Sequence, residues 1–427
     1  MNTYKKYRVV SLLSICMSLL RVIVGPITLL VLAKKMTSEE LGFYYTFFSL
    51  TAMTQLLEVG MTGVLRQYYS HSYNQDNSQD KISNYFIFSV YWYFALSILF
   101  YILGTIIPFV MYNDYQGHML WERPWFLLLA ISCFSLMLLP LNAMLDGTQR
   151  QHLLIKANIL NQLAVALSLW GFIYTGFGLY ALGLSQLIGI LSFLTTVFVL
   201  NKFSWRLIKL NYKVFNFKEV LIDLWPLLKK TSVVWFLGYF YWNGFNILSF
   251  KYLGAEMAGF IGLSVALMRA GQNIAISILN SQMTLYANTI AKGLVAESKK
   301  IFDKYFFLSF CLLLCGYAIF YMVQFLFPEF FLFKKILPIN QMIFVSIFFI
   351  FTFLISGFEV FIRCFKVEKF IFTQLVNSLL TPLLFWTGIA LNFKYFLLPI
   401  LSVLLVTIMT VYISKKSYSG FINEKSN

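Results

Sequence analysis

The chain has 427 residues, of which 59% are hydrophobic and only 12% are charged, and its mean hydropathy is +0.75. A soluble domain is about 45–50% apolar, so lipid must be the solvent for most of this chain. The net charge of +16 does not indicate a nucleic-acid partner, because the basic residues stand between apolar runs and no aromatic-basic nucleic-acid motif accompanies them.

Apolar runs long enough to cross a bilayer predict about 12 transmembrane helices, six in each half of the chain. In chain order they cover 9–33, 41–64, 84–112, 124–145, 153–175 and 178–200, then 226–250, 257–281, 304–327, 339–362, 370–391 and 395–414. The sequence therefore predicts an all-α integral membrane protein. Its expected domains are an N-terminal six-helix lobe over 1–200, a basic cytoplasmic linker over 201–225, and a C-terminal lobe with a short cytoplasmic tail over 226–427.

The distribution of lysine and arginine predicts the orientation of these spans. If both termini are cytoplasmic, the inner segments hold 24 of the 33 basic residues and the outer loops hold seven. Cytoplasmic loops of membrane proteins carry the excess of positive charge, so this count favours cytoplasmic N- and C-termini. A basic inner face also favours anionic membrane lipids as neighbours.

Two stretches of the chain, 217 residues apart, repeat the same residues. The matched pairs are Glu39 and Glu256, Gly42 and Gly259, Phe43 and Phe260, Gln55 and Gln272, and Tyr69 and Tyr286. This spacing is far longer than a solenoid repeat, whose period is about 20–50 residues, and it indicates a duplicated half. Because each half has an even number of spans, the copies have the same orientation, which predicts two parallel six-helix lobes around a central cavity.

Arg21, Glu58 and Arg269 place charge inside predicted spans, where a charged side chain costs roughly 2.5–3.5 kcal/mol. A guanidinium stays charged and offers paired donors that suit phosphate. One hypothesis is that Arg21 and Arg269, one from each half, face the central cavity and bind a pyrophosphate. The alternative is that Arg21 and Glu58 form a structural ion pair. Glu58 is also a candidate for proton coupling, although the driving ion is not identified by the sequence.

Five further charges lie at the ends of spans and are candidates for a gate or rim. Glu359 and Arg363 are one helical turn apart, which predicts an ion pair within one helix. Asp146 and Arg150 bracket a polar turn, and Arg66 ends the second predicted span. A purely structural role is the alternative for each of them.

Amide side chains inside the predicted spans are further candidates for a cavity or for ion coupling. They are Gln55, Gln272, Asn243, Asn246 and Asn273. Aromatic residues are dense beside the asparagines, and amides together with aromatic faces are what sugars require. The same residue types also hold membrane helices together, so packing remains the alternative.

Metal and nucleotide chemistry is not predicted. The five cysteines lie in or beside apolar runs, and the three histidines have no metal-ligand spacing. No GxxxxGK[ST] phosphate loop is present. We therefore expect no cofactor, no metal and no enzymatic reaction.

Five short motifs stand out in the first half of the chain: MTSEELGFY at 36–44, FSL at 48–50, QLLEVG at 55–60, RQYYSH at 66–71 and LDGTQR at 145–150. They resemble motifs of the polysaccharide-exporter branch of the multidrug/oligosaccharidyl-lipid/polysaccharide (MOP) flippase superfamily. Within that branch the chain resembles Wzx-type O-antigen or repeat-unit flippases over its whole length.

This resemblance implies a V-shaped pair of lobes around a cationic cavity, in the inner membrane of a bacterium. The implied cargo is a polyprenyl (undecaprenyl)-pyrophosphate-linked oligosaccharide, moved to the periplasmic leaflet for surface polysaccharide synthesis. The resemblance also implies cationic residues in the cavity, which Arg21 and Arg269 would supply here. A polysaccharide polymerase and a chain-length regulator are implied partners.

Other classes fit the sequence less well. A major-facilitator transporter would carry a Gly- and Arg-rich signature between its second and third spans, and the loop RQYYSHSYNQDNSQDKIS at 66–83 lacks it. A membrane-embedded glycosyltransferase or polymerase would have a large soluble loop, whereas no loop here exceeds about 25 residues. Another transporter of the same superfamily, for multidrug extrusion or other lipid-linked sugars, is the nearest alternative.

Overall fold

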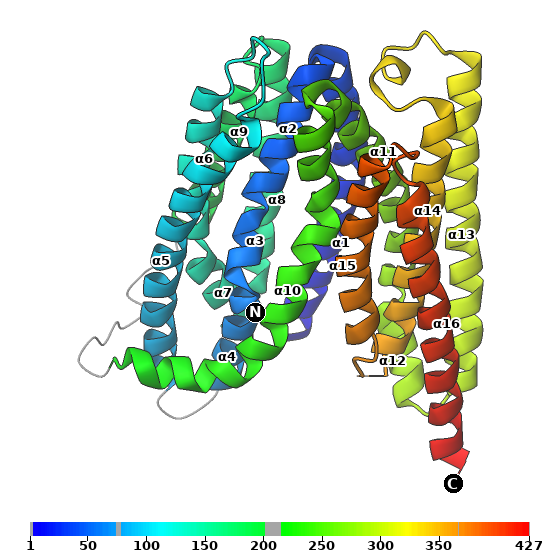
Figure 1. The fold of residues 1–427 in the computed structure, drawn as a ribbon. Coiled ribbons are helices and arrows are strands. Elements are labelled where there is room, and N and C mark those ends of the chain that lie inside the picture. Colours follow the sequence, from blue (N-terminus) through cyan, green and yellow to red (C-terminus); the bar gives the residue numbers. More distant parts are fainter. Residues whose placement is uncertain (1–2, 74–77, 201–214, 366, 427) are drawn as a thin grey trace. The chain divides into compact units, whose positions relative to one another are not determined.

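The computed structural model describes residues 3–73, 78–200, 215–365 and 367–426, and within these ranges the regular structure is helical, with no strand (Figure 1). The prediction of an all-α protein is therefore confirmed. Two compact units divide the chain, Met1–Tyr239 and Phe240–Asn427. The division lies inside one long helix. Residues 201–214 of the predicted linker lie outside the described residues, and the predicted domain boundaries stay a prediction.

The helices follow one another in a simple order along each unit. The first unit contains α1 (Thr3–Lys35), α2 (Ser38–Thr51), α3 (Met53–Glu58), α4 (Met61–Ser72), α5 (Ser78–Tyr112), α6 (Glu122–Leu136), α7 (Leu139–Gly147), α8 (Gln151–Tyr174), α9 (Tyr180–Thr195) and a π-helical turn at Thr196–Leu200. Helix α10 (Phe217–Leu253) joins the units. The second unit continues with α11 (Ala255–Ser281), α12 (Met283–Ala291), α13 (Val295–Leu326), a 3₁₀ turn at Phe333–Lys335, α14 (Ile339–Arg363), α15 (Ile371–Ala390) and α16 (Leu397–Ser426).

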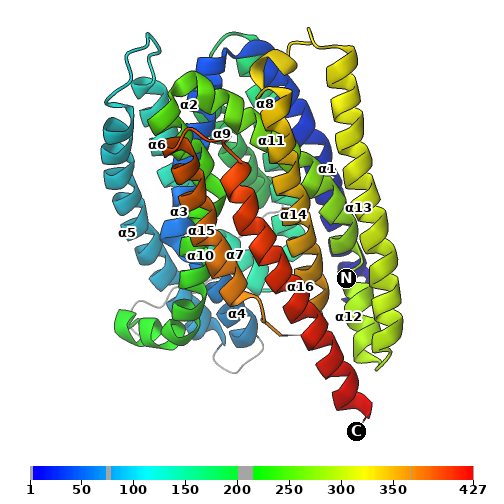
Figure 2. The same ribbon diagram turned by 45° about the vertical axis from the view of Figure 1, so that its right-hand side comes forward.

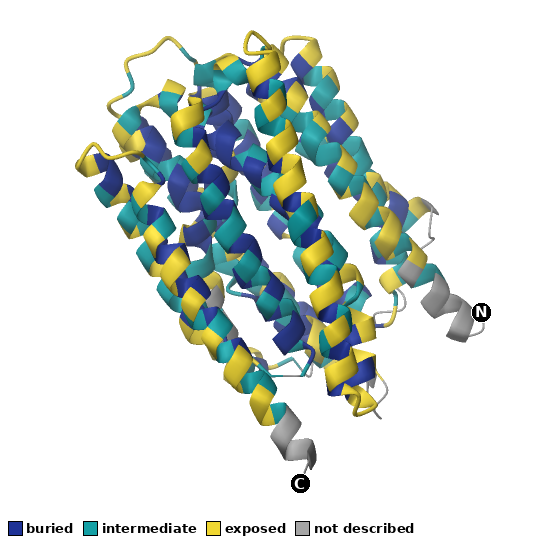
Figure 3. Ribbon diagram, turned by 90° about the vertical axis from the view of Figure 1, so that its right-hand side faces the viewer, coloured by how far each residue is buried: buried dark blue, intermediate teal, exposed yellow. Residues whose placement is uncertain are grey.

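Nine helical segments of the described chain are long and apolar enough to cross a membrane. They are Leu12–Lys35, Gln79–Tyr112, Glu122–Gly147, Gln151–Tyr174, Tyr180–Val199, Ala255–Ala291, Val295–Leu326, Ile339–Arg363 and Leu397–Phe421. Exposed residues run along the whole length of several of these helices (Figure 3), and many are large and apolar. Such faces are compatible with lipid as the surrounding solvent.

The three remaining predicted spans fall on less regular or more polar helices. The span 41–64 was expected to be one helix, but the chain there is divided among α2, α3 and α4. Span 226–250 lies within α10, and span 370–391 corresponds to α15, whose Gln374 and Asn377 lower its hydropathy.

The duplication predicted from five residue pairs extends to the helix boundaries. Subtracting 217 from the first residues of α11, α13, α14 and α16 gives 38, 78, 122 and 180, which are the first residues of α2, α5, α6 and α9. Tyr69 and its repeat partner Tyr286 are both fully buried. The second unit therefore repeats the element order of the first at a constant offset.

Each unit has its own packed interior. In the first unit α8 packs against α1 and α9, α6 against α9, and α4 against α7. In the second unit α14 packs against α11 and α16, which lie beside it in Figures 1 and 2. Phe245, Phe348, Phe385 and Phe396 form an aromatic cluster there, with ring centroids 4.9 Å apart for Phe245 and Phe385. Aromatic packing of this kind positions the second-unit helices without hydrogen bonds.

The motif at 36–44 forms the start of α2. The Thr37 hydroxyl accepts from the Glu40 amide at 3.1 Å, and the Glu40 carboxylate accepts from the Thr37 amide at 2.7 Å, which is a capping box. The neighbouring Glu39 carboxylate accepts a hydrogen bond from the Tyr115 hydroxyl. Burial, followed by this hydrogen bond, raises the pKa of Tyr115 to about 12, so the phenol remains a donor throughout the physiological range.

Gly147 permits the close packing of α7 on α4. A methyl group at this position would lie 2.5 Å from Cβ of Tyr69 and 2.7 Å from the carbonyl oxygen of Arg66. Gly147→Ala should therefore destabilise the protein by roughly 1–3 kcal/mol, because neither neighbour is the end of a flexible side chain. The measurement is the midpoint of thermal unfolding of the purified protein in detergent.

Gly171→Ala is the matched control for this substitution. Gly171 lies inside α8 with nothing within 4 Å of an added methyl. Replacing a helical glycine by alanine there should stabilise by about 0.5–1 kcal/mol, since alanine loses less backbone entropy on folding. Unfolding midpoints that move in the same direction for both variants would contradict the packing argument.

Candidate functional site

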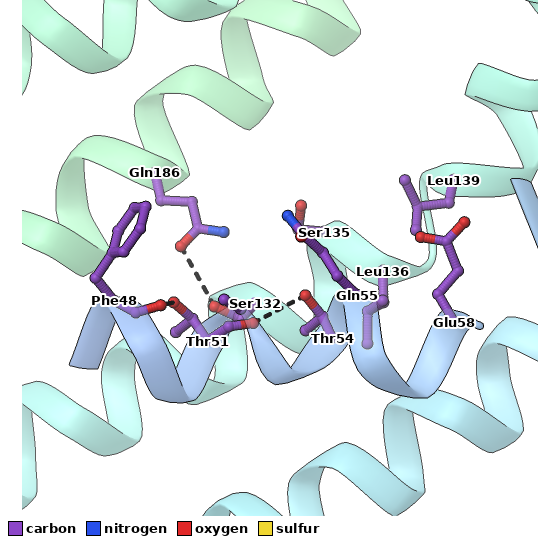
Figure 4. Close-up of a pocket in the computed structure, with 11 residues that line it drawn as sticks. Phe48, Thr51, Thr54, Gln55, Glu58, Ser132, Ser135, Leu136, Leu139 and Gln186 are labelled. Carbon is purple, nitrogen blue, oxygen red and sulfur yellow. Dashed lines mark hydrogen bonds between the residues drawn. The ribbon is translucent and has the colours of Figure 1, made fainter. Parts of the chain in front are cut away.

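A cavity of about 340 Å³ lies within the first unit (Figure 4). Its walls come from α2, α3, α6, α7 and α9. The lining residues are Phe48, Thr51, Ala52, Thr54, Gln55, Glu58, Ser132, Ser135, Leu136, Leu139 and Gln186. We call this the polar cavity, because seven of these eleven side chains carry a hydroxyl, amide or carboxyl group. Its volume falls at the lower end of the range for small-molecule sites, about 300–1,000 Å³.

A break in the helical backbone directly follows Glu58, the last residue of α3 and one of the residues that line the polar cavity. Val59 and Gly60 adopt left-handed conformations, with φ of 48° and 82°, and they separate α3 from α4. A β-branched residue with positive φ is strained, and such strain is found most often at functional sites. Inside a membrane, broken helices are tolerated where they line a cavity or are buried in protein.

Glu58 accepts a hydrogen bond from a backbone amide that the break leaves without a helical partner. Its Oε1 accepts a hydrogen bond from the Thr62 amide at 2.9 Å, in the first turn of α4. The same oxygen accepts from the Tyr93 hydroxyl at 3.1 Å, and the hydroxyls of Tyr93 and Thr62 are 2.6 Å apart. A carboxylate at a helix N-terminus is favoured by the helix dipole. Glu58 therefore stabilises the start of α4 and also contributes to the cavity wall.

Other polar groups of the cavity lie on α6 and α9, which are distant from α3 in sequence, and on α2 and α3 themselves. The Ser132 hydroxyl of α6 donates to the side-chain oxygen Oε1 of Gln186 on α9 at 3.3 Å, as Figure 4 shows. On α2 and α3, the hydroxyls of Thr51 and Thr54 donate to backbone carbonyls at 2.9 and 2.8 Å. These bonds hold the side chains in place and leave their oxygen lone pairs available.

Of the two arginines predicted to bind pyrophosphate, Arg21 is exposed on α1, and its guanidinium makes one hydrogen bond within the described residues, to the Met17 sulfur at 4.0 Å. It does not line the polar cavity. The alternative ion pair with Glu58 is not formed within the described part of the chain, since Glu58 bonds to Thr62 and Tyr93 instead.

Arg269 lies on α11 of the second unit and is half-buried. Its guanidinium stacks on the Trp242 ring, with Cζ 4.0 Å from the ring centroid. Tyr241 packs edge-on against the same ring at 4.6 Å, and its hydroxyl is 3.3 Å from that of Thr352. No carboxylate among the described residues lies within ion-pair distance of Arg269. The aromatic ring thus holds this cation without neutralising it.

The predicted amides differ in their surroundings. Gln55 lines the polar cavity. Its repeat partner Gln272 is buried, and its Oε1 has no hydrogen-bond partner within the described ranges. Asn243 is buried, Asn246 is half-buried and Asn273 is exposed. The structure therefore places Gln55 with Glu58 in one cavity, whereas the other amides belong to the second unit.

The predicted ion pair between Glu359 and Arg363 is confirmed. Their side chains are 3.4 Å apart, and Arg363 lies equally close to Glu368, while the Gln374 amide donates to Glu359 at 3.1 Å. This network accounts for the buried carboxylate, because both of its polar neighbours favour the charged form.

A second pair of predicted rim charges meets in the first unit. Arg66 and Asp146 form an ion pair of 3.2 Å between α4 and α7. Arg150, which follows the same polar turn, is half-buried, and its backbone amide donates to the Leu145 carbonyl at 3.0 Å. These contacts join the ends of helices. The role of these residues in a gate stays a prediction.

Sequence reasoning missed most of the polar cavity. The predicted spans that contain Ser132, Ser135 and Gln186 have the composition of ordinary apolar helices. These three residues line the same cavity only because of how the helices pack in the folded protein. The one available signal was the spacing of Ser132 and Ser135, which places both hydroxyls on one helix face. The aromatic residues beside the asparagines include Trp242, but its stacking against Arg269 was not predicted.

The fold is similar to that of known transporters. A multidrug resistance MATE family transporter of the MOP superfamily in its inward-facing conformation matches with a TM-score of 0.74 and 14% identity, covering 95% of each chain. An outward-facing structure of such a transporter gives 0.61 and 13%, covering 98% of this chain and 97% of the other. A MOP superfamily transporter from Pyrococcus furiosus gives 0.59 and 12%, covering 97% and 96%.

The sequence itself matches no family model and no curated protein sequence. At these identities the structural likeness establishes architecture and leaves the cargo undetermined. The chain therefore has the helical two-lobe fold of the MATE transporters in the MOP superfamily.

Proposed function

We propose that this chain is a flippase that moves polyprenyl (undecaprenyl)-pyrophosphate-linked oligosaccharide repeat units across the bacterial inner membrane for O-antigen or surface polysaccharide synthesis. The observation that carries the proposal is the environment of Arg269. A half-buried guanidinium inside a span is costly, and here it rests on Trp242 with no carboxylate beside it in the described chain. Its N–H groups remain available for an anionic headgroup, which a pyrophosphate supplies.

The fold supports the same proposal, since its structural neighbours are transporters of the MOP superfamily. The mechanism we propose is alternating access to the two membrane faces, with the lipid tail remaining in the bilayer. The exposed Arg21 is proposed as a second cation for the headgroup. The partners that follow from this cargo are a polysaccharide polymerase and a chain-length regulator.

Extrusion of cationic drugs is the competing function, because the structural neighbours include multidrug resistance transporters. The charge of Arg269 argues against it, since a guanidinium without a counter-ion repels a cationic drug. For the Pyrococcus furiosus transporter, reversed polarity of the binding pocket suggests a different function. Pocket charge is thus a reasonable criterion for separating cargo classes within this fold.

Arg269→Ala should slow flipping of undecaprenyl-pyrophosphoryl oligosaccharide by about tenfold or more. A hydrogen bond to a charged group contributes about 1.5–3 kcal/mol, and about 1.4 kcal/mol corresponds to a tenfold change. Arg269→Lys should fall between the variant and the wild type, because lysine keeps the charge but loses the planar fork. The measurement is the initial rate at which labelled lipid changes leaflet in proteoliposomes.

Arg123→Ala is the matched control in this assay, because Arg123 is an exposed arginine at the start of α6 that lines no described cavity. It should leave the rate unchanged. Wild-type protein that moves organic cations but not the lipid would contradict the proposed function. If Arg21→Ala and Arg269→Ala both flip the lipid at the wild-type rate, the pyrophosphate site is wrong.

Both termini should lie in the cytoplasm. The excess of basic residues in the predicted inner segments gives this expectation its physical basis. Green fluorescent protein fused after Asn427 should fluoresce, and alkaline phosphatase at the same position should be inactive. A fusion of alkaline phosphatase in the outer loop near Asp114 serves as the positive control. An active phosphatase at the C-terminus would overturn the orientation.

A further inference from the structure

We infer that the polar cavity of the first unit is a saccharide subsite, which binds the neutral polyhydroxyl part of the cargo. This inference rests on the proposed function and adds the part of the protein that recognises sugar. Three features of the molecule support it: the hydrogen-bonding groups in the cavity, the charge of the cavity, and the residues that the second unit has at the same repeat positions.

The free hydrogen-bonding groups suit a ligand that both donates and accepts. Gln55 and Ser135 make no side-chain hydrogen bond with the described residues, and the amide nitrogen of Gln186 is likewise open. The hydroxyl oxygens of Thr51 and Thr54 retain acceptor lone pairs. Every sugar hydroxyl is one donor and two acceptor sites, so this mixture can satisfy several hydroxyls at once.

Glu58 adds a strong acceptor to this set. Only its Oε1 is used by Thr62 and Tyr93, and Oε2 has no hydrogen-bond partner among the described residues. The pair of bonds to Oε1 fixes the carboxylate in one orientation toward the cavity (Figure 4). Hydrogen bonds from a neutral hydroxyl to a carboxylate are stronger than those between neutral groups.

The charge of the cavity excludes the pyrophosphate part of the cargo. No lysine, arginine or histidine lines it, and Glu58 is its one ionisable group. A phosphate there would meet a like charge with no compensating cation, which is costly at low dielectric. The candidate anion ligand Arg269 belongs to the second unit. Headgroup and sugar therefore have separate recognition elements.

One lining residue offers an apolar face as well. The Phe48 side chain is 55% exposed although it lies in a helix otherwise buried along most of its length, and Figure 4 shows its ring at one end of the cavity. Ligand sites commonly combine apolar or aromatic surface with a few placed polar groups. A sugar ring presents C–H groups on its faces and hydroxyls at its edge, which matches this combination.

The second unit shows that the duplicated fold does not require this cavity. The residues 217 positions after Ser132 and Gln186 are Phe349 and Val403. Both are buried, with exposed fractions of 1% and 0%, so they contribute to a packed core. A hydroxyl and an amide in the first copy thus correspond to large or branched apolar side chains in the second.

The group around Glu58 is also confined to the first copy. The repeat positions of Glu58, Thr62 and Tyr93 are Ala275, Leu279 and Phe310. Helix α11 passes without interruption through the residues that correspond to the break at Val59 and Gly60. In the first copy these groups serve the helix break, which the second copy lacks, and the Oε2 atom of Glu58 is the part of the group that remains for a ligand.

The test replaces two lining residues of the cavity by the residues at their repeat positions in the second unit. It uses the double variant Ser132→Phe and Gln186→Val in the full-length protein. Two lipids are used, undecaprenyl pyrophosphate alone and the same lipid carrying the neutral disaccharide N,N′-diacetylchitobiose. Binding of each to the purified protein is measured in detergent. The double variant should bind the glycosylated lipid about tenfold more weakly and the sugar-free lipid as the wild type does. Gln67→Val, which removes an exposed amide outside the cavity, should change neither affinity.

Unchanged sugar-free binding shows that the double variant is folded, so a loss confined to the glycosylated lipid supports the subsite. Equal losses for both lipids, or no loss for either, would overturn it. A second measurement uses Gln186→Cys in a chain whose five native cysteines are replaced by alanine. Free N,N′-diacetylchitobiose should slow its modification by a hydrophilic maleimide, and an unchanged rate overturns the subsite.

This protection experiment does not depend on flipping or on Arg269. If Gln186→Cys is protected by the free disaccharide but the proteoliposomes move no lipid, the proposed flippase function fails and the subsite stands. If the lipid is flipped but the disaccharide neither protects the cysteine nor adds to binding, the function stands and the subsite fails.

Discussion

The hydrogen bonding of Glu58 at the end of α3 is the interaction on which the candidate site depends. A bilayer offers no water to backbone groups, so helices that break within it need a local partner. Here the break at Val59 and Gly60 leaves the start of α4 without acceptors, and the Glu58 carboxylate supplies one. Tyr93 then holds the carboxylate in place. Glu58, the residue that serves the break, is also one of the α3 residues that line the polar cavity.

Duplication gave the protein two similar scaffolds, and the polar residues then diverged. The helix starts repeat at an offset of 217, and the buried Tyr69 and Tyr286 still correspond. Arg269, however, has Ala52 as its repeat partner, and Glu58 has Ala275. Because a buried charge or amide is expensive in lipid, such groups persist most readily where they have a ligand or a specific partner. The hydroxyl, amide and carboxylate groups of the polar cavity in the first unit and the stacked guanidinium in the second are polar features that the two copies do not share.

Local sequence predicted the helices well where one apolar run forms one helix, as in α13 and α14. It failed over 41–64, because Val59 and Gly60 lie within an apolar run and nothing local shows that both take positive φ. The pair Glu359 and Arg363 was predictable, since its spacing lies within one helix. The stacking of Arg269 on Trp242 joins two helices and was not predictable from spacing.

Composition and periodicity by themselves determined that the chain is helical and that lipid surrounds most of it, and five matched residue pairs indicated that its two halves are copies. These properties follow from hydrophobicity and local geometry, which a sequence carries directly. Only the tertiary structure decided that Ser132 and Gln186 meet Glu58 in one cavity, and that Arg21 does not pair with Glu58. Such groupings depend on which helix faces pack together, and that choice is made by side-chain packing across the whole unit.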